Sequence, residues 1–190
     1  MALAYLAGVP RAWVIAVMAA ALAALSAMEA IRLTYRTRPE SDPMGLIART
    51  YARLARRFMR THERRGDWVA ALASVSGYLL VLIAFDKPTA IAGILAASLG
   101  DPAARLVGRR FGTVKLVRHK SLQGTLALGL VAWLAARALG FAWPAALGGA
   151  AGAALADYAS AFRPLDIGLD DNFTAPVAAS LGIWAVTGLL

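Results

Sequence analysis

The chain has 190 residues, of which 59% are hydrophobic and only 16% are charged, yet its formal net charge is +9. Soluble domains carry about 25% charged residues, so this composition excludes an ordinary soluble domain and predicts a polytopic membrane protein. The absence of cysteine excludes disulfides and thiolate metal sites, and the two histidines, His62 and His119, lack the spacing of a zinc site. We therefore expect one integral membrane domain over residues 1–190, without a nucleic-acid partner.

Six segments are apolar and long enough to be candidate transmembrane helices, which need about 20 mostly apolar residues. They cover residues 12–33, 68–85, 88–107, 122–139, 143–162 and 173–190. The first segment could instead be a signal peptide, but the basic stretch that follows it is typical of a retained span. Small residues recur every four positions at Gly148, Gly152 and Ala156, which predicts a close helix–helix seam and would permit a homodimer. The predicted fold class is an all-α bundle of about six transmembrane helices.

Lysine and arginine are concentrated in the loops on one side of this predicted bundle. Of the 20 Lys and Arg residues, ten lie in residues 32–65, six lie in residues 105–120, and Arg163 follows the fifth segment. Arg11, Lys87 and Arg137 fall on the other side. Because basic residues stay preferentially in the cytoplasm, we expect the basic loops at the cytoplasmic face and both termini on the opposite side.

Residues 44–65 are expected to form a basic amphipathic helix between the first two segments. Ile47, Tyr51, Leu54 and Phe58 fall at helical spacing, and a second face carries Arg49, Arg53, Arg57, Arg60 and Arg64. Such a helix rests its apolar side in the headgroup region and offers its basic side to anionic lipid or polyphosphate. The alternative is a helix that only anchors the loop.

The third segment is interrupted by Gly100, Asp101 and Pro102. Residues 88–99 alone would extend about 18 Å, which is too short for a hydrocarbon core of about 30 Å. An acid followed by proline is a helix-start signal, so we expect Asp101 to cap a second short helix. The third helix is therefore predicted to be broken, with the break facing a ligand cavity. The alternative is a helix that ends there and leaves Asp101 in a surface loop.

A glycine-rich and basic stretch follows this interruption. Gly108 and Gly112 would let backbone amides approach a phosphate, and nearby cations would neutralise it. The spacing is not that of a P-loop, and glycines four apart also occur at helix-packing contacts. The other candidate nucleotide-binding residues are Arg109, Lys115, Lys120, Ser121 and Gly124.

Acidic residues gather again before the sixth segment. The cluster consists of Asp166, Asp170, Asp171 and Asn172. Oxygen ligands of this kind suit Mg²⁺, which accompanies substrate phosphates, so cations together with carboxylates suggest phosphoryl or nucleotidyl transfer. Asp157 and Glu29 are further acids within apolar segments, and each is either part of a lipid or proton-accepting site or a paired structural residue.

Three blocks resemble the signatures of the CTP-dependent lipid kinase family, which includes dolichol kinase, phytol kinase and yeast-type diacylglycerol kinase. They are GDPAARLVGRRFG from Gly100, KSLQG from Lys120 and DDNFTAPVA from Asp170. The resemblance implies transfer of the CTP γ-phosphoryl group, with Mg²⁺, to the hydroxyl of a membrane lipid such as a polyprenol, a phytol-like alcohol or diacylglycerol. The sequence departs from the family pattern at Pro102, at Gln123 and at Asp157, where a small residue or Thr, Glu and Glu respectively are common.

Carried onto this chain, the resemblance implies catalytic roles for Asp101, Lys120 and Asp171. It implies that Asp101 and Asp171 hold Mg²⁺, with Asp170 and Asn172 as further candidates, and that Lys120 stabilises the transferring phosphoryl group. Two other functions remain open. One is a cytidylyltransferase that makes a CDP-lipid from CTP and a phospholipid, although its long C-terminal acidic motif is not evident. The other is a non-enzymatic membrane transporter or scaffold.

Overall fold

The computed structural model describes residues 5, 7–35, 37, 41–55, 70–117, 120–160 and 170–189. Over these residues the chain is almost entirely helical, which confirms the predicted all-α class. The elements are α2 (Arg11–Tyr35), α3 (Pro43–Ala55), α5 (Ala70–Ala84), α6 (Lys87–Phe111), β1 (Lys115–Val117), β2 (Lys120–Ser121), α7 (Leu122–Ala138), α8 (Trp143–Ala159) and α9 (Asp171–Thr187). Predicted features in residues 56–69, 118–119 and 161–169, including Asp166 and the second half of the amphipathic helix, lie outside the described residues.

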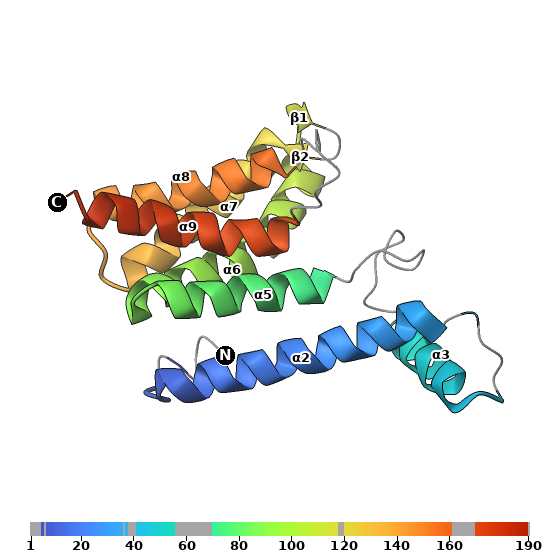
Figure 1. The fold of residues 1–190 in the computed structure, drawn as a ribbon. Coiled ribbons are helices and arrows are strands. Elements are labelled where there is room, and N and C mark those ends of the chain that lie inside the picture. The colour runs from blue at the N-terminus through green and yellow to red at the C-terminus, as the bar shows by residue number, and fades with distance from the viewer. Residues whose placement is uncertain are drawn as a thin grey trace.

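Helices α5 to α9 run alternately up and down in one bundle, and α2 lies along α5 (Figure 1). The antiparallel β1–β2 hairpin sits at the end of the bundle where α6 ends and where α7 and α9 begin. The beginning of α2 and the end of α9 lie at the opposite end (Figure 1). This geometry is compatible with the predicted topology, while the membrane side of each end stays a prediction.

Two kinds of packing hold the bundle together. Large apolar side chains, including Val81, Leu82 and Ile91, form the core shared by α2, α5 and α6. Between α8 and α9 the helices touch through glycine, because a Cβ added to Gly148 would lie 2.4 Å from the carbonyl oxygen of Gly182. The small-residue seam predicted from the sequence is therefore filled by α9 of the same chain, and the homodimer that it would permit stays a prediction.

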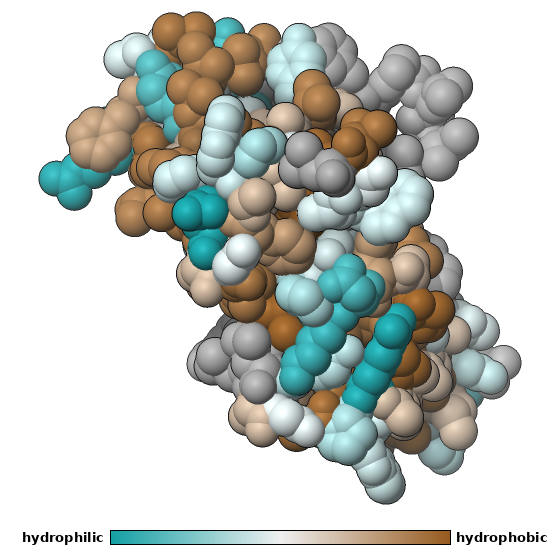
Figure 2. All heavy atoms as spheres, turned by 90° about the vertical axis from the view of Figure 1, so that its left-hand side faces the viewer, coloured by the Kyte–Doolittle hydropathy of each residue, from teal (hydrophilic) through white to brown (hydrophobic). Residues whose placement is uncertain are grey.

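The helices coincide with the six predicted segments to within a few residues, but six membrane spans are not confirmed. Helices α2 and α6, each of 25 residues, are long and apolar enough to cross a membrane. Helices α7, α8 and α9 have 17 residues each, which corresponds to about 26 Å, slightly less than a hydrocarbon core of about 30 Å. Apolar side chains also cover much of the end at which α2 begins, where hydrophilic ones are scattered (Figure 2).

The prediction of a broken third helix is wrong, because α6 continues without interruption from Lys87 to Phe111 with Pro102 inside it. Proline at this position removes the bond that residue 102 would donate to the carbonyl of Ser98, which lies on the exposed side of the helix. Packing on the other side keeps α6 straight enough to continue, since Gly100 is buried against Leu128 of α7. Asp101 is consequently a mid-helix residue and not an N-cap.

The first half of the predicted amphipathic helix is α3. It begins at Pro43, where the Asp42 carboxylate accepts a hydrogen bond of 2.9 Å from the Met44 amide. Its apolar side is not wholly left to lipid, because Tyr51 packs against Leu72 of α5, as Leu22 of α2 also does. Several apolar side chains of α3 remain exposed, namely Met44, Leu46, Ile47 and Leu54.

Candidate active site

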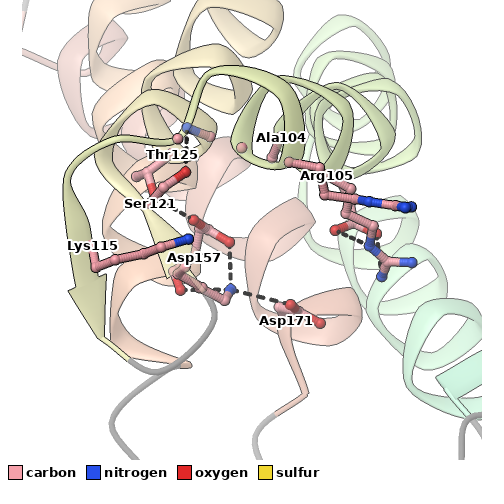
Figure 3. A pocket seen from close by; sticks show the side chains of 13 residues that line it. Ala104, Arg105, Lys115, Ser121, Thr125, Asp157 and Asp171 are labelled. Atoms are coloured by element: carbon pink, nitrogen blue, oxygen red, sulfur yellow. Dashed lines mark hydrogen bonds and ion pairs between the residues drawn. The ribbon is translucent and has the colours of Figure 1, made fainter.

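A cavity of about 630 Å³ opens at the hairpin end of the bundle. It lies among the second half of α6, the hairpin, the starts of α7 and α9 and the end of α8 (Figure 3). Its lining includes most residues singled out from the sequence: Asp101, Gly108, Arg109, Gly112, Lys115, Lys120, Ser121, Gly124, Asp157 and Asp171. Ala104, Arg105 and Thr125 complete the lining. Segments far apart in the sequence thus supply cations and carboxylates to one space.

Lys120 is the most connected cation of this cavity. Its Nζ donates to the Asp157 carbonyl oxygen at 2.8 Å, to the Ser160 Oγ at 2.8 Å and to the Asp171 Oδ2 at 3.2 Å. It also forms an ion pair with the Asp157 Oδ1. The side chain of Lys120 is 23% exposed, so these contacts hold a partly buried ammonium at the cavity wall. Lys120 therefore ties the hairpin to both α8 and α9.

Asp157 is buried, and both of its carboxylate oxygens have partners among the described residues. Oδ1 meets Lys120, and Oδ2 accepts a hydrogen bond of 2.6 Å from the Thr125 hydroxyl (Figure 3). A buried carboxylate is stable only when it is paired and hydrogen-bonded in this way. Of the two interpretations offered by the sequence, the geometry favours the paired structural residue over a proton acceptor open to substrate.

Asp101 lines the cavity from α6 and pairs with Arg105 one turn further along. Its Oδ1 accepts from the Arg105 Nε at 3.0 Å, and its Oδ2 lies 2.7 Å from the second guanidinium nitrogen. Arg109 and Lys115 also line the cavity, but neither has an ion-pair partner within the part of the chain that the structure describes. As far as the described residues go, these two cations would meet an anionic ligand without first giving up a carboxylate.

The glycines of this region bring α6 close to the start of α7. A Cβ added to Gly124 would lie 2.8 Å from the Ala104 carbonyl oxygen, and one added to Gly108 would lie 2.9 Å from the Ser121 Oγ. Ser121 caps α7, because its Oγ accepts from the Gly124 amide at 3.2 Å. The packing alternative considered for Gly108 and Gly112 thus has direct support, and close approach of a phosphate to these glycines stays a prediction.

Asp170 and Asn172 do not line the cavity. Asp170 is the N-cap of α9, and its Oδ1 accepts from the Asn172 amide at 2.9 Å and from the Asn172 side chain. Burial raises the pKa of the Asp170 carboxyl, and the neighbouring Asp171 acts in the same direction, whereas the bonds from Asn172 lower it. The structure accordingly gives these two residues a local role in starting the helix that carries Asp171.

Glu29 is also remote from the cavity lining. It is 0% exposed on α2 and forms a buried ion pair with Arg32, one turn away on the same helix. Desolvation by burial raises the pKa of Tyr51 on α3, and the Glu29 carboxylate adds to the rise. Glu29 therefore belongs to the α2–α3 junction and not to the site around Asp101.

No group of three or more His, Asp or Glu residues that could hold a metal ion occurs within the described ranges. The cavity does present two partly exposed carboxylates, Asp101 and Asp171, from different helices. Mg²⁺ is commonly held by one or two carboxylates together with substrate phosphates. The donor set thus fits an ion shared with a nucleotide better than a site made by protein alone.

Sequence reasoning missed Thr125, Ser160 and Arg105. Thr125 carries no motif, but it lies four residues after Ser121, so helical spacing alone could have placed it on the same wall. Gln123 has a role that its departure from the family pattern did not suggest. Its side-chain amide donates to the Thr113 Oγ1 at 2.6 Å and accepts from the Val114 amide at 3.3 Å, which closes the hairpin.

Comparison with known proteins gives one informative relative. This chain is 30% identical, over an alignment of 160 residues that covers 74% of it and 70% of the relative, to a CTP-dependent diacylglycerol kinase from Schizosaccharomyces pombe. No family model matches the chain. No solved structure matches it either.

Proposed function

The chain belongs to the CTP-dependent lipid kinase family, and on that premise we propose that it transfers the γ-phosphoryl group of CTP to the hydroxyl of a membrane lipid. One observation supports the cavity at the hairpin end as the place of this reaction. The cavity joins two cations without carboxylate partners in the described chain, Arg109 and Lys115, to carboxylates from α6 and α9. This is the combination that a triphosphate and an attacking hydroxyl require.

Arg109 and Lys115 bind the nucleotide phosphates in this proposal. Both reach the cavity from elements that flank its opening, the end of α6 and strand β1. Lys120 is already anchored by α8 and carries its charge at the wall, where it stabilises the negative charge that spreads over the transferring phosphoryl group. In this proposal, Arg109 and Lys115 bind the nucleotide, whereas Lys120 stabilises the transition state.

The chemical step is a displacement at phosphorus. The lipid hydroxyl oxygen forms a bond to the γ-phosphorus, the bond between that phosphorus and the β–γ bridging oxygen breaks, and CDP leaves with the bonding electron pair. The hydroxyl proton passes to a carboxylate beside the attacking oxygen. Among the carboxylates that line the cavity, the Asp101 and Asp171 side chains are 27% and 23% exposed, whereas Asp157 is buried. We assign the proton to Asp101 or Asp171 for that reason.

Mg²⁺ is proposed as the companion of the nucleotide, held by Asp101 and Asp171. When bound, it would neutralise charge on the phosphates. We leave Asp170 and Asn172 out of the proposed metal pair, because neither lines the cavity and both take part in the capping bonds at the start of α9.

The relative's name makes diacylglycerol the first acceptor to test, followed by polyprenol and phytol-like alcohols. We propose that α2 and α5 to α9 are embedded in a membrane with the cavity at its cytoplasmic face. The lipid hydroxyl would then meet CTP where the bundle reaches water. Arginine-bearing α3 projects from the bundle at the same end as the hairpin (Figure 1), where it can contact anionic headgroups.

Radiolabelled CTP tests the proposal directly. Purified protein in lipid nanodiscs is given CTP labelled at the γ- or the α-phosphate, together with diacylglycerol, a polyprenol or phytol. Label from the γ-phosphate should enter the lipid, and Asp101→Asn should abolish the transfer while the protein keeps its thermal stability. Lipid labelled from the α-phosphate would instead identify a cytidylyltransferase, and no lipid product with any acceptor would contradict an enzymatic role.

A further inference from the structure

Thr125 lies in the first turn of α7 and connects that helix to α8. Its side chain is buried, and its Oγ1 donates a hydrogen bond of 2.6 Å to the Asp157 Oδ2. This bond spans 32 positions of sequence, and both of its residues line the cavity (Figure 3). Since a buried carboxylate keeps its orientation only through such partners, Thr125 fixes the position of the Asp157 side chain.

Asp157 in turn holds Lys120 at two points, through its backbone carbonyl oxygen and through Oδ1. Ser160, one turn further along the chain, supplies a third contact at 2.8 Å. The fourth acceptor among the described residues, the Asp171 Oδ2, lies farther away at 3.2 Å. Because an ammonium group has three hydrogens, the four acceptors cannot each receive one, and the longest contact is the weakest.

This geometry separates a fixed side of Lys120 from an exchangeable one. Contacts to Asp157 and Ser160 come from a single helix end and hold the ammonium against α8. The contact to Asp171 faces the cavity, where a phosphate oxygen could replace the carboxylate. One contact of the fixed side, the ion pair with Oδ1, depends on the orientation of the Asp157 carboxylate, and the Thr125 hydroxyl restrains that orientation.

We infer that Thr125 is a positioning residue for phosphoryl transfer: through Asp157 it holds Lys120 in the place from which the ammonium meets the transferring phosphate. The inference rests on the proposed function for its catalytic meaning. Its structural part can be measured without any substrate. This part is that the Thr125 hydroxyl restrains the Lys120 ammonium through the Asp157 carboxylate that lies between them.

The first measurement is the chemical reactivity of Lys120. Full-length protein in detergent micelles is treated with a trace of acetic anhydride, and mass spectrometry gives the acetylation of Lys120 relative to Lys115, which has no ion-pair partner in the described chain. An amine held by several acceptors reacts slowly. Thr125→Val should raise the Lys120 to Lys115 ratio by about threefold or more, since loss of the bond frees Asp157, whereas Thr125→Ser should keep the wild-type ratio.

The second measurement is steady-state transfer from CTP to diacylglycerol. Thr125→Val should lower kcat by about tenfold while the KM for CTP changes by less than about threefold, because ground-state phosphate binding rests on Arg109 and Lys115. Thr125→Ser should restore kcat to within about twofold of wild type. The matched control is Thr187→Val at the far end of α9, because within the described structure the Thr187 hydroxyl bonds only to carbonyls of its own helix.

These results distinguish the inference from the function on which it rests. A labelling ratio that Thr125→Val leaves unchanged, or a Thr125→Ser protein as impaired as the valine variant, overturns the positioning role. If wild-type protein transfers nothing from CTP, the proposed function fails, and the labelling ratio alone then decides whether Thr125 restrains Lys120. Should the valine variant not purify as a folded protein, Thr125→Ala removes the same hydroxyl without adding a methyl group and is judged by the same criteria.

Discussion

Gly124 offers a direct test of how closely α6 and α7 approach beneath the cavity. In Gly124→Ala the new methyl group would lie 2.8 Å from the Ala104 carbonyl oxygen, a backbone atom of α6 that cannot rotate away, and 3.2 Å from the Ser121 Oγ. Relieving this overlap requires a shift between the helices, and overpacking of this kind costs about 1–3 kcal/mol. Replacing glycine by alanine in a helix gains up to about 1 kcal/mol. The steric cost should exceed this gain, so Gly124→Ala should lower the free energy of unfolding by about 1–2 kcal/mol.

Gly129→Ala is the matched control, because Gly129 is buried in the same helix but its added Cβ would lie 3.6 Å from the nearest atom, an ordinary contact. It should be neutral or stabilising by up to about 1 kcal/mol. Thermal unfolding of the purified variants in one detergent gives the comparison. Kinase assays should show a loss for Gly124→Ala alone, since only that change pushes on α6 at Ala104, one turn from Asp101. Equal stability and equal activity of the two variants would refute the close approach of α6 and α7.

Further substitutions probe the Lys120 contacts, the Asp170 cap and the Glu29–Arg32 pair, each by thermal unfolding in detergent. Lys120→Met should lower the free energy of unfolding by about 2 kcal/mol, which is less than for a fully buried pair because Lys120 is partly exposed. The control Lys115→Met should cost less than about 0.5 kcal/mol. Equal effects of the two variants would argue against the Lys120 contacts. Asp170→Ala should cost about 1 kcal/mol by loss of the helix cap, whereas Asp170→Asn keeps the cap. Because the pKa of Asp170 is raised above 3.8 in the folded chain, the stability of wild type relative to Asp170→Asn should fall as the pH rises through and above 3.8; a constant difference would contradict the raised pKa. Glu29→Gln should lower the free energy of unfolding by about 3 kcal/mol, because it leaves Arg32 buried without its charge partner. The double variant Glu29→Leu, Arg32→Leu should cost much less, and equal losses would contradict a buried ion pair.

The same dipeptide, Asp-Pro, behaves differently at two places in this chain, which shows where local signals stop being sufficient. At Asp42 and Pro43 it starts α3 with the acid as cap, as the helix-start pattern predicts. At Asp101 and Pro102 it lies inside α6. The second case is decided by non-local packing of Gly100 on Leu128, a contact that no window of sequence around Asp101 contains. The positions of the apolar segments were predictable from the sequence, whereas the continuity of α6 through Asp101 and Pro102 was not.

The candidate site follows a similar division. Asp101, Lys120 and Asp171 were identifiable because charge is rare in an apolar chain and because they lie in the blocks that resemble the lipid kinase family; all three line one cavity. Their partners were not identifiable. Thr125 resembles any threonine of an apolar helix until the fold brings it to Asp157. The adjacency of Asp170 and Asn172 to Asp171 suggested a shared metal site, which stays a prediction; the capping bond between the Asp170 carboxylate and the Asn172 amide was not part of it.

Continuity of α6 also bears on how the proposed site works. Asp101 and Arg109 lie eight residues apart on one rigid helix, so their separation along the axis is fixed at about 12 Å, whereas a broken helix would let it vary. Lys120, by contrast, is neutralised by Asp157 and Asp171. An incoming triphosphate would therefore meet Arg109 and Lys115 first and reach Lys120 only by displacing Asp171. In the proposed function, the phosphate therefore meets Lys120 only after nucleotide binding has replaced the contact of 3.2 Å between Lys120 and Asp171.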